Sequence, residues 1–121
     1  MAEQSPRFKV VSEGDVSVVE MLQKRIVEEG TISEISGQLY ELAAQAGKPR
    51  MVVDFANVTH MSSSALGMLI TLHKRVRERG GRLALCNIRP SIFEVFVITR
   101  LNEVFKVCAG RDEAVHEAAS A

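Results

Sequence analysis

The chain lacks most of the residue patterns that identify a membrane protein, a secreted protein or a metalloprotein. No apolar run approaches the roughly 20 residues that span a bilayer, and the segment from Met1 to Arg7 has no apolar core of the kind found in signal peptides. The 121 residues include two cysteines and no tryptophan. We therefore expect a cytoplasmic protein that does not associate with a membrane.

The residues that usually bind metals and cofactors are few and scattered. Cys86 and Cys108 lie in apolar surroundings, match no metal-ligand spacing, and are expected to be buried reduced thiols. The histidines form no metal-ligand pattern. Neither a P-loop nor a dinucleotide-binding fingerprint is present, because the pair Gly80-Gly81 follows a predicted helix and does not open one. The sequence therefore predicts no metal and no cofactor.

Charge of one sign does not dominate the chain. The 15 basic residues balance the 15 acidic residues, which gives no reason to expect direct binding of nucleic acid. Basic residues do gather between Lys74 and Arg82, where they complement the carboxyl end of a helix or, alternatively, contact a nucleic acid or an acidic partner. With 46% hydrophobic and 25% charged residues, positions 1–121 are expected to form one globular domain with a flexible N-terminus at 1–6.

Apolar periodicity predicts alternating strands and helices. The expected strands are Phe8–Ser12, Val16–Leu22, Met51–Phe55, Arg82–Cys86 and Asn102–Val107, with a hairpin between the first two and a polar loop at Gln23–Gly30. The expected helices open at a capping box formed by Thr31 and Glu34, at about Ser63, near Pro90 and at Arg111. This order predicts an α/β fold: a single domain with a mixed, mostly parallel β-sheet, an N-terminal hairpin and about four helices.

Each of the first three helices is expected to bury one face. The expected buried positions are Ile32, Ile35, Leu39, Leu42 and Ala46 in the first helix, Leu66, Leu69, Ile70, His73 and Val76 in the second, and Ile92, Val95, Phe96 and Thr99 in the third. The strand Met51–Phe55 is expected to be covered on both faces, because its β-favouring residues run consecutively and do not alternate with polar ones.

The most informative segment is Met61-Ser62-Ser63-Ser64-Ala65-Leu66-Gly67, which opens the second helix. Serine is a good helix N-cap, because its oxygen accepts hydrogen bonds from the free N–H groups of the first turn. The same N–H groups and the helix dipole favour an anion such as a phosphate. We therefore interpret the segment either as a cap alone or as a cap that also carries a phosphorylation site.

A hydrolase is a remote alternative. It would use Ser63 as nucleophile, His60 as base and Asp54 to orient the base. The sequence has no Gly-x-Ser-x-Gly elbow and no glycine-rich oxyanion loop, which argues against this interpretation.

An ordered set of motifs resembles the STAS domain of bacterial anti-sigma factor antagonists. The resemblance covers about residues 7–118. Its motifs are Asp54-Phe55, the serine run from Met61 to Gly67, Gly80-Gly81, an apolar strand ending in Cys86, Ile88-x-Pro90, and the later residues Phe93, Phe96, Leu101 and Phe105.

The resemblance implies a small regulatory protein and not an enzyme. Antagonists of this family bind an anti-sigma factor that is also a serine kinase and so release a sigma factor; the kinase phosphorylates the antagonist, and a phosphatase resets it. Aligned with the family pattern, Ser63 falls on the phosphoacceptor, ahead of Ser62 and Ser64. Met61, Ser62, Ser63 and Ser64 are then expected to face the partner.

Two segments depart from the family pattern. Ser62 stands where the family usually has Asp, and Gln23–Gly30 lacks the Gly-Glu-Leu-Asp type of sequence common there. An alternative function therefore stays open: a STAS scaffold or partner-binding module of a signalling complex, in which the serines act only as caps.

Overall fold

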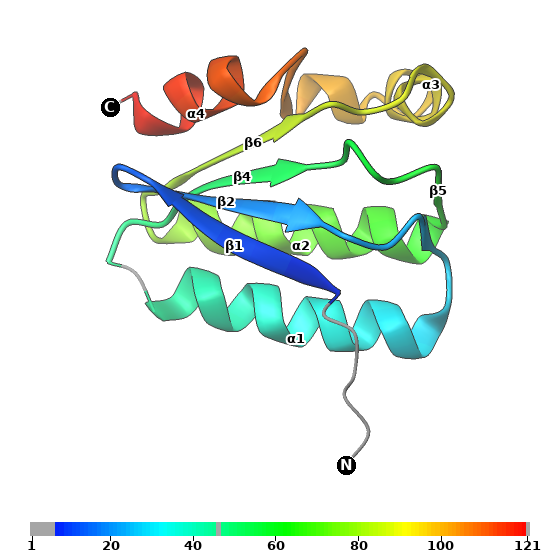
Figure 1. The fold of residues 1–121 in the computed structure, drawn as a ribbon, viewed down its shortest axis with the longest axis horizontal. Coiled ribbons are helices and arrows are strands. Elements are labelled where there is room, and N and C mark those ends of the chain that lie inside the picture. Colours follow the sequence, from blue (N-terminus) through cyan, green and yellow to red (C-terminus); the bar gives the residue numbers. More distant parts are fainter. Residues whose placement is uncertain (1–6, 46, 121) are drawn as a thin grey trace.

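The computed structural model describes residues 7–45 and 47–120, and it shows a five-stranded sheet with helices on both faces (Figure 1). The strands are β1 (Phe8–Glu13), β2 (Val16–Met21), β3 (Arg25–Ile26), β4 (Arg50–Asp54), β5 (His60–Met61), β6 (Arg82–Cys86) and β7 (Lys106–Cys108). The helices are α1 (Glu29–Gln45), α2 (Ser63–Glu78), α3 (Pro90–Ile98), a 3-10 turn η1 (Leu101–Glu103) and α4 (Arg111–Ala119). The expected flexibility of residues 1–6 falls on positions outside the described residues.

The main sheet has the strand order β1-β2-β4-β6-β7. β1 pairs with β2 in antiparallel fashion, and β2, β4, β6 and β7 pair in parallel. α1 and α2 cover one face of the sheet, while α4 lies across the other (Figure 1). The predicted α/β class, the mixed sheet with its N-terminal hairpin, and the four α-helices are therefore confirmed for the described part of the chain.

Strand β4 is buried on both faces, as its consecutive apolar residues predict. Val53 packs into the main core with α1 and α2, whereas Val52 packs into a smaller core with α4, because successive side chains of a strand point to opposite faces. Cys86 and Cys108 belong to the smaller core and are free thiols, which confirms their expected burial. Burial raises the pKa of the Cys86 thiol to about 12, so it is not a reactive thiolate at neutral pH.

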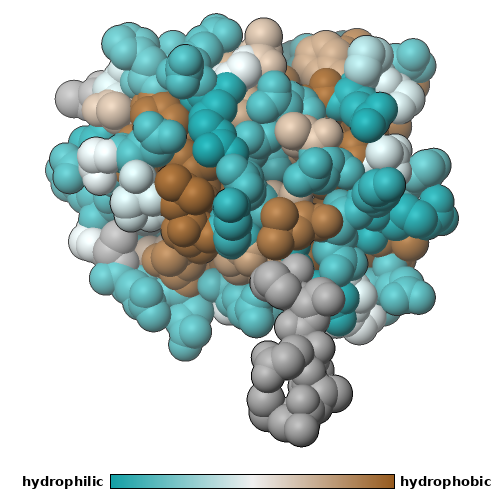
Figure 2. All heavy atoms as spheres, in the orientation of Figure 1, coloured by the Kyte–Doolittle hydropathy of each residue, from teal (hydrophilic) through white to brown (hydrophobic). Residues whose placement is uncertain are grey.

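Strand β1 forms one edge of the sheet and leaves some apolar side chains at the surface. Figure 2 shows this face, where brown apolar areas lie between teal hydrophilic side chains. Val10 of β1 is 44% exposed, and Leu22, which follows β2, is 37% exposed. Part of the apolar surface on this face forms a continuous brown band in Figure 2.

Helix α1 begins earlier than the predicted capping box. The N–H of Ile32 donates to the carbonyl of Glu28 at 2.9 Å, so the helix starts at Glu29 and Thr31 lies within its first turn. The buried residues are Ile32, Ile35 and Leu39, as expected, but Ala43 is buried where Leu42 was expected and Leu42 is only half-buried. Ala46, also expected to be buried, lies outside the described residues.

The buried face of α2 is shifted from its predicted position. Leu69 and Val76 are buried as expected, whereas Leu66, Ile70 and His73 are half-buried. The other buried residues are Ala65, Met68 and Leu72. The reason is that α2 packs against both α1 and the sheet, which turns a different arc of the helix inward than a single contact would.

Helix α3 and the segment after it also differ from the expectation. Ile92 and Phe96 are buried, but Val95 is 41% exposed and Thr99 is exposed. α3 is only 9 residues long, and its buried side chains are those of Ile92 and Phe96. The predicted strand Asn102–Val107 is wrong up to Phe105, because the left-handed backbone of Arg100 (φ 63°) starts the 3-10 turn η1 and pairing begins only at Lys106 in β7.

Candidate functional site

The serine run is held in place by a small second sheet. β3 pairs in parallel with β5, so that Arg25 lies beside His60 and Ile26 beside Met61. The N–H of Ser62 then donates to the carbonyl of Ile26 at 3.1 Å. This pairing was not predicted, because two-residue strands carry too little periodicity to be recognised. It fixes the start of α2 near the carboxyl ends of the parallel strands, where α/β sheets usually place their binding sites (Figure 1).

Ser62 has the cap role. Its backbone is extended (φ −91°, ψ 170°), and its Oγ accepts a hydrogen bond from the N–H of Ala65 at 3.3 Å. The side chain is half-buried and turned back onto the first turn of α2. Ser62 is therefore the N-cap of the helix, as one interpretation of the sequence expects.

Ser64 ties two helices together. Its hydroxyl donates to Oε2 of Glu29 at 2.7 Å, and Glu29 is the first residue of α1. The contact was missed from the sequence because 35 residues separate the two positions. The Ser64 hydroxyl is thus already engaged by a carboxylate, which would repel an added phosphate.

Ser63 differs from both neighbours. It is the first residue of α2, it is exposed, and within residues 7–45 and 47–120 its hydroxyl makes no hydrogen bond. Met61, just before the run, is half-buried against the main core. The run therefore presents one free hydroxyl, at the N-terminus of a helix, between two hydroxyls that have structural partners.

The residues of the hydrolase alternative are not assembled into a relay. The Asp54 carboxylate accepts from the N–H of Ala56 at 2.9 Å, from the amide of Asn87 at 3.0 Å and from Arg111, while Nδ1 of His60 lies 2.8 Å from Oγ1 of Thr59. In the described part of the chain, no three His, Cys, Asp or Glu side chains gather as metal ligands, and no helix is both long and apolar enough to cross a bilayer.

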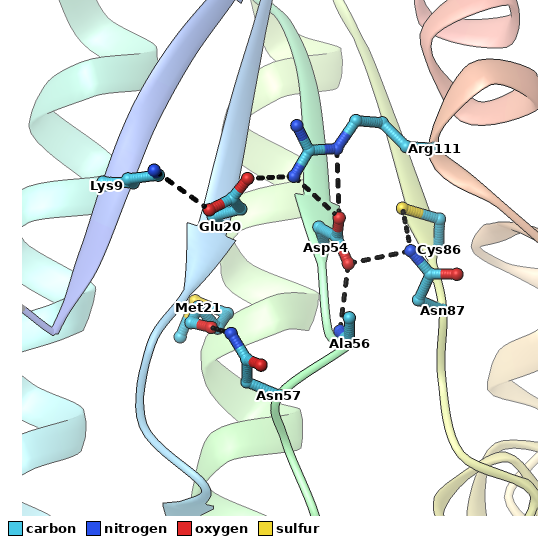
Figure 3. A network of polar contacts seen from close by, with 9 residues as sticks. All are labelled: Lys9, Glu20, Met21, Asp54, Ala56, Asn57, Cys86, Asn87 and Arg111. Atoms are coloured by element: carbon cyan, nitrogen blue, oxygen red, sulfur yellow. Dashed lines mark hydrogen bonds and ion pairs between the residues drawn. The ribbon is translucent and has the colours of Figure 1, made fainter.

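A network of charged side chains joins α4 to the ends of β2 and β4 (Figure 3). Arg111, the first residue of α4, donates to Glu20 through Nη2, and through Nε and Nη2 to Oδ2 of Asp54 at 3.1 and 3.0 Å. Glu20 and Asp54 are register partners on neighbouring strands, and Lys9 lies 3.6 Å from the far oxygen of Glu20. The hydrogen bond from Arg111 lowers the pKa of Glu20, and the same bond raises the pKa of Arg111.

Sequence reasoning missed this network, although it left a signal. Glu20 is the last residue but one of β2 and Asp54 is the last residue of β4, and each follows two consecutive valines. An acidic residue at such a place needs a cation or hydrogen-bond donors when it is buried. Asp54 is only 4% exposed and receives both. Asn87, whose left-handed backbone (φ 58°) follows β6, supplies one of these donors.

Comparisons with known proteins agree with this architecture. Residues 8–114 match the family described as the STAS domain. BtrV of Bordetella bronchiseptica, named as an anti-sigma factor antagonist, is 36% identical over 76 residues, which are 61% of this chain and 66% of that protein. The anti-sigma-B factor antagonist of Bacillus subtilis is 30% identical over 78 residues, 64% of this chain and 70% of that protein.

A solved structure shows the same fold over nearly the whole chain. The STAS domain protein of Planctomyces limnophilus, described as an anti-sigma-factor antagonist, superposes with a TM-score of 0.82 and 25% identity, covering 93% of this chain and 98% of that one. The segment matched to BtrV is slightly less than two thirds of BtrV. Several relatives of the chain are named anti-sigma factor antagonists, and the chain belongs to the STAS domain family.

Proposed function

We propose that this protein binds an anti-sigma factor and is switched off by phosphorylation of Ser63. The observation that carries the proposal is the exposed Ser63 hydroxyl, which is free while Ser62 caps α2 and Ser64 is bonded to Glu29. A kinase needs an accessible hydroxyl, and Ser63 offers one without any hydrogen bond that must first be broken.

The position of Ser63 also suits the modified form. A phosphoserine carries about −1.5 to −2 charges at pH 7. At the first residue of α2 this charge lies beside the free N–H groups of the helix, which stabilise anions. When a partner packs over Ser63, the phosphate must lose its hydration, which costs free energy. The carboxylate of Glu29, which is bonded to the neighbouring Ser64, also repels it. Phosphorylation would therefore weaken partner binding without requiring the domain to unfold.

The partner we propose is an anti-sigma factor that is also a serine kinase, with a phosphatase to restore the free hydroxyl. Two relatives named as anti-sigma factor antagonists support this class of partner. Met61, Ser62 and Ser64 would then lie around the acceptor in the partner-facing surface. The family relation also favours a regulatory role over an enzymatic one.

A non-phosphorylated STAS module is the second candidate. It is favoured by one observation, the hydrogen bond from the Ala65 N–H to Ser62, which shows that the run has a structural use of its own. In that case the protein would bind its partner constitutively.

Incubation with ATP and a candidate anti-sigma kinase, followed by mass spectrometry, distinguishes the two. We expect one phosphate on the wild type, none on Ser63→Ala, and one on the matched control Ser64→Ala. Partner binding, measured by calorimetry, should be lost after phosphorylation of the wild type and kept by Ser63→Ala. A wild type that binds the kinase but gains no phosphate on Ser62, Ser63 or Ser64 would leave only the constitutive module.

A further inference from the structure

A recess in the surface begins beside the serine run and lies between β3, β5 and α3. It has a volume of about 300 Å³. Its apolar wall is formed by Val27, Met61, Leu66, Ile92 and Val95. Met61 and Leu66 lie on either side of Ser63 in sequence, so the recess and the proposed phosphoacceptor belong to one surface.

A second hollow adjoins the recess at Arg25. It has a volume of about 330 Å³, shares Arg25 and Val27 with the first and extends toward Lys24, Glu28 and the first turn of α1. The two open hollows therefore adjoin at Arg25 and Val27. We call the pair of hollows the Arg25 groove.

The first hollow, which carries the apolar wall, is lined by basic residues and by no acidic residue of the described part of the chain. Arg25 and His60 are the ionisable residues that line it. Arg25 is exposed, and no carboxylate of the described part of the chain forms an ion pair with it. The groove therefore offers a solvated cation next to an apolar wall.

Helix α3 adds to both the attraction for a negative group and the apolar wall of the first hollow. Its N-terminus has no side-chain cap, and Ser91 of its first turn lines the first hollow. Pro90 has no N–H, and the N–H groups of Ile92 and Phe93 donate to the carbonyl of Arg89. The N–H of Ser91 is therefore the donor that this helix start offers to a negative group. Val95 lines the same hollow and is 41% exposed. Covering this apolar side chain with a bound segment would remove it from water, which is favourable.

We propose that the Arg25 groove receives a segment of the partner protein in which a carboxylate lies next to an apolar side chain. The carboxylate would pair with Arg25, and the apolar side chain would lie against Val95 and Met61. Two adjoining open hollows fit a peptide segment better than a small molecule, because small-molecule sites bury most of their ligand. The identity of the partner as an anti-sigma factor rests on the proposed function, whereas the chemistry of the groove does not.

Short peptides provide a probe that does not require the partner. Three tripeptides with acetylated and amidated ends, Leu-Glu-Leu, Leu-Gln-Leu and Leu-Lys-Leu, are titrated into the full-length ¹⁵N-labelled protein and followed by NMR. We expect amide shifts at Arg25, His60, Ser91 and Val95. Leu-Glu-Leu should bind about threefold more tightly than Leu-Gln-Leu, the size expected of an exposed ion pair, and Leu-Lys-Leu more weakly than either.

Matched variants assign the effect to the groove. Arg25→Gln should abolish the preference for Leu-Glu-Leu, while Arg77→Gln, which removes an exposed arginine at the other end of α2, should keep it. Val95→Asn should weaken Leu-Glu-Leu and Leu-Gln-Leu equally, and Val97→Asn, also exposed on α3 but outside the recess, should weaken neither. All four positions are exposed, so the variants are expected to fold.

The proposal is overturned if Leu-Lys-Leu binds as tightly as Leu-Glu-Leu, if the amide shifts lie outside the groove, or if Arg77→Gln removes the preference as Arg25→Gln does. These outcomes are separate from failure of the proposed function. Selective peptide binding by a protein that no kinase phosphorylates contradicts the switch and supports the groove. Phosphorylation of Ser63 without selective peptide binding supports the switch and contradicts the groove.

Discussion

Three adjacent hydroxyls in this protein have three different environments. Ser62 accepts from a backbone N–H, Ser64 donates to Glu29, and Ser63 is exposed to solvent. The helical geometry produces this division, because consecutive residues at a helix start point about 100° apart around the axis. Single substitutions can therefore test the contribution of the run to fold stability separately from its proposed phosphorylation.

Replacing Ser62 by alanine is expected to destabilise the fold, whereas replacing Ser63 is not. Ser62→Ala removes the acceptor for the Ala65 N–H and should lower the free energy of unfolding by about 0.5–2 kcal/mol, the usual value of a serine N-cap. Ser63→Ala removes an exposed hydroxyl and should change it by less than about 0.5 kcal/mol. Urea denaturation of both variants measures the difference; equal losses would show that Ser62 is not the cap.

At the scale of elements, α4 is held to the sheet by an arginine at each end. Arg111 binds Glu20 and Asp54 at the start of α4. At its end, Nη1 of Arg50 lies within hydrogen-bond distance of the carbonyls of Ala118 and Ala119 and of the C-cap residue Ser120, at 3.1, 2.9 and 3.0 Å. The helix itself contributes only two buried side chains, Ala114 and Ala118. Two alanines bury little apolar surface, so these polar contacts matter more for α4 than for α1 or α2.

Arg111→Met is expected to lower the free energy of unfolding by about 2–4 kcal/mol, because it leaves the buried Asp54 carboxylate without its cation beside the acidic Glu20. Lys9→Met is the matched control. It removes a cation from the same Glu20, but its side chain is 60% exposed and the change should stay below about 1 kcal/mol. Hydrogen exchange should show that Arg111→Met exposes the amides of α4 more than those of α2; equal exposure of both would argue against a local role.

The pH dependence of this variant follows from the pKa of Glu20, which Arg111 lowers in the folded protein. A carboxylate with a lowered folded-state pKa stabilises the fold above its unfolded pKa, about 4.3, and loses this contribution as the pH falls further. Arg111→Met lacks the contribution at any pH. The difference in stability between wild type and variant should therefore be largest near neutral pH and shrink below about pH 4. A difference that stays constant across this range would mean that Glu20 does not respond to Arg111.

For the whole molecule, the sequence predicts the order of layers better than the contacts between them. The alternation of apolar strands with amphipathic helices depends on residues close in sequence, and it leads to the observed sheet. The bond between Arg111 and Glu20 joins residues 91 positions apart, and no local pattern specifies it. The same reason explains the errors on α2 and α3: which arc of a helix is buried depends on how many neighbours pack against it. The position of Ser63 was predictable because a helix start is a local feature.

A phosphate on Ser63 is expected to change the surface near α2 and to leave the fold of the whole molecule intact. The site lies outside the core, where Val52 and Val53 of β4 are fully buried. Protein carrying phosphoserine at position 63, introduced during synthesis, should differ from the unmodified protein by less than about 1 kcal/mol in free energy of unfolding, because the attraction of the helix dipole is partly offset by Glu29. NMR shifts should be confined to β3, β5 and the first turns of α1 and α2. Raising the salt concentration should reduce the difference in free energy of unfolding between the phosphorylated and the unmodified protein, because solvent-exposed charges are screened. Shifts that spread through β4 and β6, or a loss of cooperative unfolding, would show instead that the switch acts by disrupting the core.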